Sequence, residues 1–186
     1  MQNHRTEVVP ERPARFEELY ERYASAVLAY ARRRVDPSTA EDIAAEVFAI
    51  AWRRIDDVPE SAALPWLYGT ARNVLANELR ARRRRHKLVE HATTAAHIRS
   101  ARDEDSDSND AVLTALRQLS AEEQEVLMLA AWEELDGRQA ATALGCSPTA
   151  YRIRLHRARR KLRQQLAADQ EPAEAVPLNL HLKEMS

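Results

Sequence analysis

The sequence predicts an all-α protein: two small helical domains joined by a flexible linker, the second containing a helix-turn-helix. Apolar side chains recur at helical spacing through most of the 186 residues, and no segment shows the alternation typical of a strand. Glycine occurs only 3 times, which argues against Gly-rich phosphate loops and turn-rich β sandwiches. The formal net charge of -1 conceals two basic blocks separated by an acidic segment.

The acidic segment at residues 103–110 marks the joint between the domains. It holds five acids in eight residues and no apolar side chain. Such a segment cannot bury enough surface to offset the entropy of ordering it. We therefore predict a disordered N-terminus at 1–13, a helical domain at 14–88, a linker at 89–110, a second helical domain at 111–168 and a flexible tail at 169–186. Each domain is small, so each is expected to be only modestly stable alone.

Three helices are predicted in the first domain. The first runs from Phe16 to Ala31, and Asp36-Pro37 breaks it. Ser38 or Thr39 is the expected cap of a second helix with apolar positions from Ile43 to Ile55. Residues 56–63 are a predicted loop. A third helix begins near Leu64-Pro65 and continues into a run of arginines.

Four helices are predicted in the second domain. The fourth in the chain spans Val112 to Leu119, and Ser120 with Glu123 forms a capping-box pattern for the fifth, which Gly137 is expected to end. Residues 138–144 form a short sixth helix. Gly145 and Cys146 make a turn, and Ser147-Pro148 opens a last helix to about Ala167.

The last two helices predict a helix-turn-helix that reads DNA. Tyr151, Leu155, Ala158 and Leu162 form the inward stripe of the last helix, and arginines occupy its other face. Arginine there can bond guanine with both of its terminal nitrogens in the major groove. The alternative is a solvated basic helix end, but seven basic residues and no acid between Arg152 and Arg163 exceed what solubility needs. The expected contacts to phosphate are Arg160, Lys161 and Arg163.

A second basic block lies between Arg72 and Lys87, with seven basic residues and one acid. The preceding helix carries Trp66, Tyr68 and Asn73, and aromatics beside a cationic groove suit stacking of unpaired bases. The alternative is that both aromatics belong to the core and that the arginines are a solvated end. About 20 residues from 91 to 110 could reach roughly 70 Å, which is about two turns of B-DNA.

Several classes of function are disfavoured. No stretch is apolar enough to span a membrane, and the N-terminus has no secretory apolar region, so a cytoplasmic protein without membrane insertion is expected. One cysteine excludes an internal disulfide, and Cys146 is expected to be a packing residue rather than a redox sensor. The six histidines lack metal-ligand spacing, and Asp42 with Glu46 favours a docking or solvated face over a metal. We predict no catalytic residue, metal or cofactor.

Five strings resemble the extracytoplasmic-function (ECF) type of bacterial RNA polymerase sigma factor, in the sigma-70 family. They are AEDIAAEVFAIAWR at 40–53, WLYGTARN at 66–73, LSAEEQEVL at 119–127, LGCS at 144–147 and RLHRARRKL at 154–162. The strings occur in the family's order, on both sides of an unmatched linker. The resemblance covers most of residues 16–166.

The resemblance implies a role for each basic helix and for the acidic one. The domain at 14–88 would be region two, and that at 111–168 region four. Region two would bind the β′ clamp of core polymerase and melt the minus-ten promoter element, while region four would read the minus-thirty-five element and meet the β flap. The residues implied are Asp42, Glu46, Phe48, Trp52 and Arg53 for polymerase; Trp66, Tyr68, Arg72, Asn73, Arg80, Arg83 and Arg84 for minus-ten; and Arg152, Ile153, Arg154, His156, Arg157 and Arg160 for minus-thirty-five.

Two further expectations accompany this interpretation. The resemblance implies an anti-sigma protein as a regulatory partner, together with promoter DNA and polymerase. The alternative function is a self-sufficient helix-turn-helix repressor that acts without polymerase. Such repressors usually dimerise, and the sequence shows no sustained heptad seam for a dimer.

Overall fold

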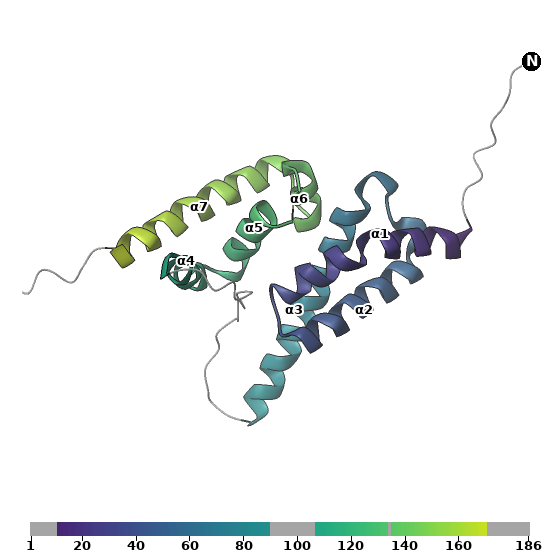
Figure 1. The fold of residues 1–186 in the computed structure, drawn as a ribbon, viewed down its shortest axis with the longest axis horizontal. Coiled ribbons are helices and arrows are strands. Elements are labelled where there is room, and N and C mark those ends of the chain that lie inside the picture. Colours follow the sequence, from purple (N-terminus) through teal and green to yellow (C-terminus); the bar gives the residue numbers. More distant parts are fainter. Residues whose placement is uncertain (1–10, 90–106, 134, 171–186) are drawn as a thin grey trace, which may run out of the picture.

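The computed structural model describes residues 11–89, 107–133 and 135–170, and every regular element among them is helical (Figure 1). This confirms the predicted all-α class. The elements are α1 (Arg12–Arg32), α2 (Pro37–Arg53), η1 (Ile55–Asp57), η2 (Glu60–Ala62), α3 (Ala63–Val89), α4 (Asp107–Arg117), α5 (Ala121–Ala131), α6 (Gly137–Leu144) and α7 (Pro148–Gln170).

Helices α5 and α7 begin where the sequence predicted. At the start of α5, Ser120 and Glu123 form the predicted capping box: the Glu123 carboxylate accepts the Ser120 N–H at 2.8 Å, and the Ser120 hydroxyl accepts the Glu123 N–H at 3.3 Å. Ser147 caps α7 by accepting the Ala150 N–H at 3.2 Å. Satisfied N–H groups at these ends fix where each helix starts.

Some predicted boundaries were wrong. The cap of α2 is Asp36, not Ser38 or Thr39, and Pro37 occupies the first helical position. Helix α5 ends at Ala131, and Gly137 is instead the first residue of α6, which Asp136 caps. Helix α4 begins at Asp107, inside the predicted linker, because acidic residues are favourable in a first helical turn. The predicted loop at 56–63 contains most of two 3-10 turns.

The ends of the chain fall partly outside the described residues. Helix α1 already begins at Arg12 and α7 continues to Gln170, so residues 12–13 and 169–170 are helical rather than disordered. The predictions for residues 1–10, most of the linker at 90–106 and the tail at 171–186 lie outside the described residues.

The described residues form two hydrophobic clusters. Helices α1, α2 and α3 enclose Val27, Val47 and Leu67, all fully buried, and Ile55 closes the end of this bundle. Helices α4, α5 and α7 share a second cluster of Leu113, Leu116, Leu119, Leu127 and Ala158.

The two groups also pack against each other, which the sequence analysis did not anticipate. Helix α6 lies against α3 (Figure 1), and the interior of the α1–α3 bundle continues into α5, α6 and the start of α7. Gly69 is at the crossing: a Cβ placed there would be 3.2 Å from the Ala143 carbonyl oxygen. The absence of a side chain at Gly69 lets the two backbones approach closely.

Candidate nucleic-acid interface

Helices α6 and α7 form the predicted helix-turn-helix. Gly145 lies between them with φ +63°, a left-handed conformation that glycine adopts without strain. The Cys146 N–H donates to the Ala141 carbonyl at 2.9 Å and closes the turn. On α7, Tyr151 and Ala158 face inward and are buried, as predicted. The opposite face of α7 is therefore directed away from the rest of the domain.

The predicted minus-thirty-five residues all lie on exposed positions of α7. Ile153 is 48% exposed, which is unusual for a large apolar side chain that has no partner surface. The arginines of this set have no carboxylate within ion-pair distance anywhere in the described ranges. The exposed members are Arg152, Ile153, Arg154, His156, Arg157 and Arg160. Unpaired guanidinium groups on one helix face give a strong attraction for phosphate and base edges.

Lys161 does not belong to this cationic face, contrary to the prediction. Its ammonium contacts the Glu123 carboxylate at 2.9 Å and so ties α7 to α5. Lys161, with the Ser120 N–H, holds the pKa of Glu123 below its usual range. We therefore assign Lys161 to the packing of the domain rather than to phosphate contact.

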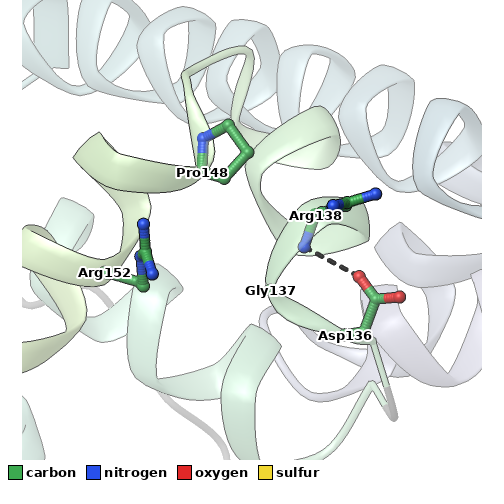
Figure 2. A pocket seen from close by; sticks show the side chains of 5 residues that line it. All are labelled: Asp136, Gly137, Arg138, Pro148 and Arg152. Atoms are coloured by element: carbon green, nitrogen blue, oxygen red, sulfur yellow. Dashed lines mark hydrogen bonds between the residues drawn. The ribbon is translucent and has the colours of Figure 1, made fainter.

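A shallow depression of about 450 Å³ opens between the starts of α6 and α7 (Figure 2). Asp136, Gly137, Arg138, Pro148 and Arg152 line it. The Asp136 carboxylate caps α6 and accepts the N–H groups of Gln139 at 2.8 Å and Arg138 at 2.7 Å, which lower its pKa. In the described part of the chain, no three His, Cys, Asp or Glu side chains gather into a metal site.

The second basic block continues along α3 and is only partly available. Asn73, Arg80, Arg83 and Arg84 are exposed, and Arg80 donates to the Asn77 side chain at 2.6 Å. Trp66 and Arg72 are half-buried. Arg82 contacts Glu78 at 3.0 Å and Asp36 at 3.4 Å, so it links α3 to the start of α2.

Tyr68, predicted to contact the minus-ten element, is buried and 3% exposed in this conformation. Its ring stacks on that of Tyr30 with the centroids 5.0 Å apart. Burial, together with Glu133, raises the pKa of Tyr68 well above its usual value. A DNA base cannot reach this ring here, so the direct role must be corrected: of the two aromatics, Trp66 alone is partly open.

The acidic face of α2 is available to a partner. Asp42, Glu46, Trp52 and Arg53 are exposed, with Trp52 at 43%. Phe48 is 5% exposed and meets the Tyr20 ring edge-on at 4.8 Å. The prediction of a contacting role for Phe48 is therefore corrected, because this side chain supports the exposed aromatic surface from below.

Sequence reasoning missed a charged cluster between the two groups. Arg34, at the end of α1, donates to Glu125 of α5 at 2.8 Å and to Glu133 at 3.1 Å. Arg33 also pairs with Glu133, whose side chain is completely buried. Burial disfavours the charge on Arg34, but Tyr30 and Glu125 outweigh it and raise the pKa of the guanidinium. The signal was the run of arginines at 32–34, which ends a helix beside apolar residues.

Known proteins match both helical groups. The Sigma-70 region 2 family matches residues 19–85, and the Sigma-70 region 4 family matches residues 109–162. The ECF RNA polymerase sigma factor SigL of Mycobacterium tuberculosis is 33% identical over 150 residues, covering 78% of this chain and 85% of SigL. RNA polymerase sigma factor CarQ of Myxococcus xanthus is 31% identical over 154 residues, covering 81% of this chain and 88% of CarQ.

The fold is also found in solved structures. The sigma factor RpoE of Bartonella quintana, in complex with the anti-sigma factor NepR, has a TM-score of 0.64 at 23% identity, covering 83% of this chain and 98% of RpoE. CnrH, in complex with the cytosolic domain of CnrY, has a TM-score of 0.56 at 24% identity, covering 83% of this chain and 88% of CnrH.

The order of a three-helix bundle followed by a cationic helix-turn-helix, in an all-α chain, is that of the sigma-type transcription initiation proteins. The relatives make the assignment specific: the chain belongs to the ECF group of RNA polymerase sigma factors. In the described residues, no helix is long and apolar enough to cross a membrane.

Proposed function

We propose that this sigma factor binds core RNA polymerase in the cytoplasm and directs initiation at promoters that it reads at two places. Helix α7 contacts the minus-thirty-five element, and α3 with residues 55–62 contacts and opens the minus-ten element. The observation that carries this proposal is the exposed face of α7, which holds Ile153 and four arginines that have no carboxylate partner among the described residues. The role is one of binding rather than catalysis.

The α7 face suits the major groove. Arg152 lies in the second turn of the helix beside the depression at the start of α6, and it can pair with the two acceptors of a guanine. Ile153, at 48% exposure, suits contact with a thymine methyl group. Arg160, two turns further on, is placed for phosphate. Base-reading residues thus occupy one end of the helix face and positioning residues the other.

The minus-ten contact is supported by the end of the α1–α3 bundle. Arg15 of α1 donates to the Val58 carbonyl at 2.6 Å and so holds the segment between α2 and α3. Trp66 lies next to this segment, with the Arg54 guanidinium 5.8 Å from its ring centroid. A half-buried indole beside a guanidinium is a suitable stacking platform for an unpaired base, while Asn73, Arg80, Arg83 and Arg84 follow the backbone.

The exposed face of α2 is the proposed polymerase contact. Asp42, Glu46 and Arg53 offer charge, and Trp52 offers a large apolar surface at its edge. Trp and Arg are enriched where binding energy concentrates in protein interfaces. We also propose the β flap as a contact of the second helical group, and an anti-sigma protein as a regulator, since RpoE and CnrH were solved with NepR and CnrY.

Reconstitution with core polymerase tests this function. The purified chain should co-purify with core polymerase, and transcripts made with genomic DNA should start at defined promoters. The double variant R152A/R157A should retain polymerase binding and lose these transcripts, whereas Q164A, an exposed position on the same helix, should retain both. Failure to bind core polymerase would overturn the proposal. Tight operator binding by a dimer without polymerase would favour the repressor.

A further inference from the structure

One arginine in the basic run at the end of α3 points in a different direction from its neighbours. Arg80, Arg83 and Arg84 are exposed, and their spacing of three and four residues places them on one side of the helix. We call these three the outer arginines. Arg82 instead follows Leu79 by three positions, and Leu79 is partly buried against the bundle. Arg82 therefore continues the stripe of α3 that faces α1 and α2.

The Arg82 guanidinium joins two helices. Its Nε donates to the Glu78 carboxylate on the same helix at 3.0 Å. Its two terminal nitrogens reach the start of α2, where Nη1 donates to Asp36 at 3.4 Å and Nη2 donates to the Thr39 hydroxyl. A planar guanidinium can serve acceptors on two helices at once, which the single ammonium of a lysine cannot do in the same way.

The acceptors on α2 are fixed by their own hydrogen bonds. The Asp36 carboxylate accepts the Thr39 N–H at 3.1 Å, the Ser38 hydroxyl at 2.8 Å and the Thr39 hydroxyl at 2.9 Å. Thr39 is buried. Asp36 is the cap of α2, so these bonds belong to the helix end itself. Arg82 thus binds a preformed pair of acceptors rather than two free side chains.

The end of α3 has few other attachments. None of the side chains at residues 80–84 is buried, and this part of α3 extends beyond the rest of the α1–α3 bundle (Figure 1). Arg80 bonds within its own helix, to the Asn77 side chain at 2.6 Å and the Ala76 carbonyl at 3.2 Å. Among residues 80–84, Arg82 is the side chain with a hydrogen bond to another helix. Since most helical stability comes from packing, this contact matters for the order of the helix end.

We propose that Arg82 is a positioning residue for minus-ten binding: it anchors the end of α3 to the start of α2 and so directs the outer arginines to the DNA backbone, without touching DNA itself. The inference rests on the proposed function of α3. Helix α2 also carries the proposed polymerase face, which includes Asp42 and Glu46. Arg82 therefore fixes the DNA-binding arginines relative to the surface that binds polymerase.

The competing interpretation is that Arg82 is a phosphate contact that rests on Asp36 when DNA is absent. The two interpretations predict opposite effects of one substitution. D36S removes the carboxylate but keeps a residue that caps helices as well as aspartate does. If Arg82 contacts phosphate, D36S frees its charge and strengthens DNA binding. If Arg82 is a positioning residue, D36S releases the end of α3 and weakens DNA binding.

Holoenzyme binding to DNA over a range of salt distinguishes them. The probe is a promoter duplex mapped by the reconstitution above, with its minus-ten region left unpaired. R82M and D36S should each weaken binding about two- to fivefold, the range expected for the loss of one partly exposed ion pair. The salt slope should stay the same, because the outer arginines still pair with the same phosphates. R82M/D36S should bind no more weakly than either single variant, since both remove one contact.

Two other arginine variants calibrate the measurement. R83M removes a proposed phosphate contact and should lower the salt slope by about 0.7–0.9. R22M, at an exposed position on α1, removes the same charge from the bundle and should change neither affinity nor slope. Stronger binding by D36S, unchanged affinity of R82M, or a slope for R82M that falls as it does for R83M would each overturn the positioning role.

The anchor can also be measured without polymerase. Spin labels at A49C on α2 and R84C on α3, both exposed positions, in a C146S background report the position of the α3 end in the chain alone. The distance distribution should broaden in R82M and in D36S. Their urea midpoints should stay near that of the parent chain, because the two side chains of the pair are 39% and 34% exposed and add little to stability.

This measurement separates the inference from the proposed function. If R82M keeps the narrow distribution of the parent chain, the anchor is refuted whatever the polymerase experiments show. If the parent chain fails to bind core polymerase, the sigma-factor function is refuted, while a broadened distribution in R82M and D36S would still establish Arg82 as the anchor of α3.

Discussion

Arg34, Arg82 and Arg152 lie in different environments, and each environment sets a different role. Arg34 is 6% exposed and neutralised by two glutamates, so it contributes to packing. Arg82 is partly exposed and links α3 to Asp36. The pKa of Asp36 is lowered mainly by the Thr39 N–H and the hydroxyls of Ser38 and Thr39, and Arg82 adds the smallest contribution. Arg152 is exposed and has no carboxylate partner in the described ranges. Of these three side chains, only Arg152 is available to DNA.

Arg152 and Arg160 should differ in what their loss does to promoter binding. R152A should relax selectivity at one base pair by about 1–3 kcal/mol, because a base contact is lost. R160A should weaken binding to all sequences alike and reduce the salt slope by about 1, since a phosphate contact is lost. The measurement is holoenzyme binding to single-base promoter variants over a range of salt. If R152A weakened every sequence equally, Arg152 would be a phosphate contact.

At the scale of elements, local chemistry made most helices predictable. Ser120 and Ser147 accept backbone N–H groups at the starts of α5 and α7, and Gly145 adopts the left-handed conformation that ends α6. These interactions lie within four residues along the chain, so the residue type alone indicates the helix end. The wrongly predicted helix boundaries also arise from local capping chemistry. Asp36 and Ser38 are both good caps, and Asp36 prevails because Pro37 already favours the first helical position. The glycine at position 137 predicts a helix end, but Asp136 before it caps α6, so Gly137 begins a helix.

Gly145 offers a test of the turn between α6 and α7. G145A should destabilise the fold by about 1–2 kcal/mol, because an alanine at φ +63° meets backbone strain that glycine does not. No atom lies within 4 Å of the added Cβ, so crowding contributes nothing. Urea unfolding measures the change. G145N is the control and should lose less, since asparagine tolerates this conformation better. Equal losses would contradict the strain argument.

At the scale of the whole molecule, the packing of one helical group on the other could not be predicted from the sequence. Ala140, Ala141, Ala143 and Leu144 are all buried, but some of these contacts are made within the helix-turn-helix and others against α3. Small apolar residues on a helix give the same sequence pattern whether they pack within the helix-turn-helix or against α3. Buried Tyr68 and Phe48 were misjudged similarly, because an aromatic beside charged residues looks exposed until a tertiary neighbour covers it.

Alkaline pH should weaken the whole fold through two tyrosines at this contact. Burial raises the pKa of Tyr30 and of Tyr68 above the usual value, whereas in the unfolded chain each ionises near about pH 10. Above that pH the unfolded chain releases protons that the folded chain retains. The free energy of unfolding is therefore unaffected below about pH 9 and falls at higher pH, by up to roughly 1.4 kcal/mol per pH unit for each tyrosine.

Urea unfolding at a series of pH values between about 8 and 11 measures this slope. Y30F/Y68F should lose most of it, with a remainder from Tyr151, whose pKa burial also raises. Y20F, which removes a half-exposed phenol from α1, should keep it. Because the Tyr30 hydroxyl donates to Glu125, its ionisation would also place two negative charges side by side between α1 and α5. A wild-type slope in Y30F/Y68F would show that other groups control alkaline stability.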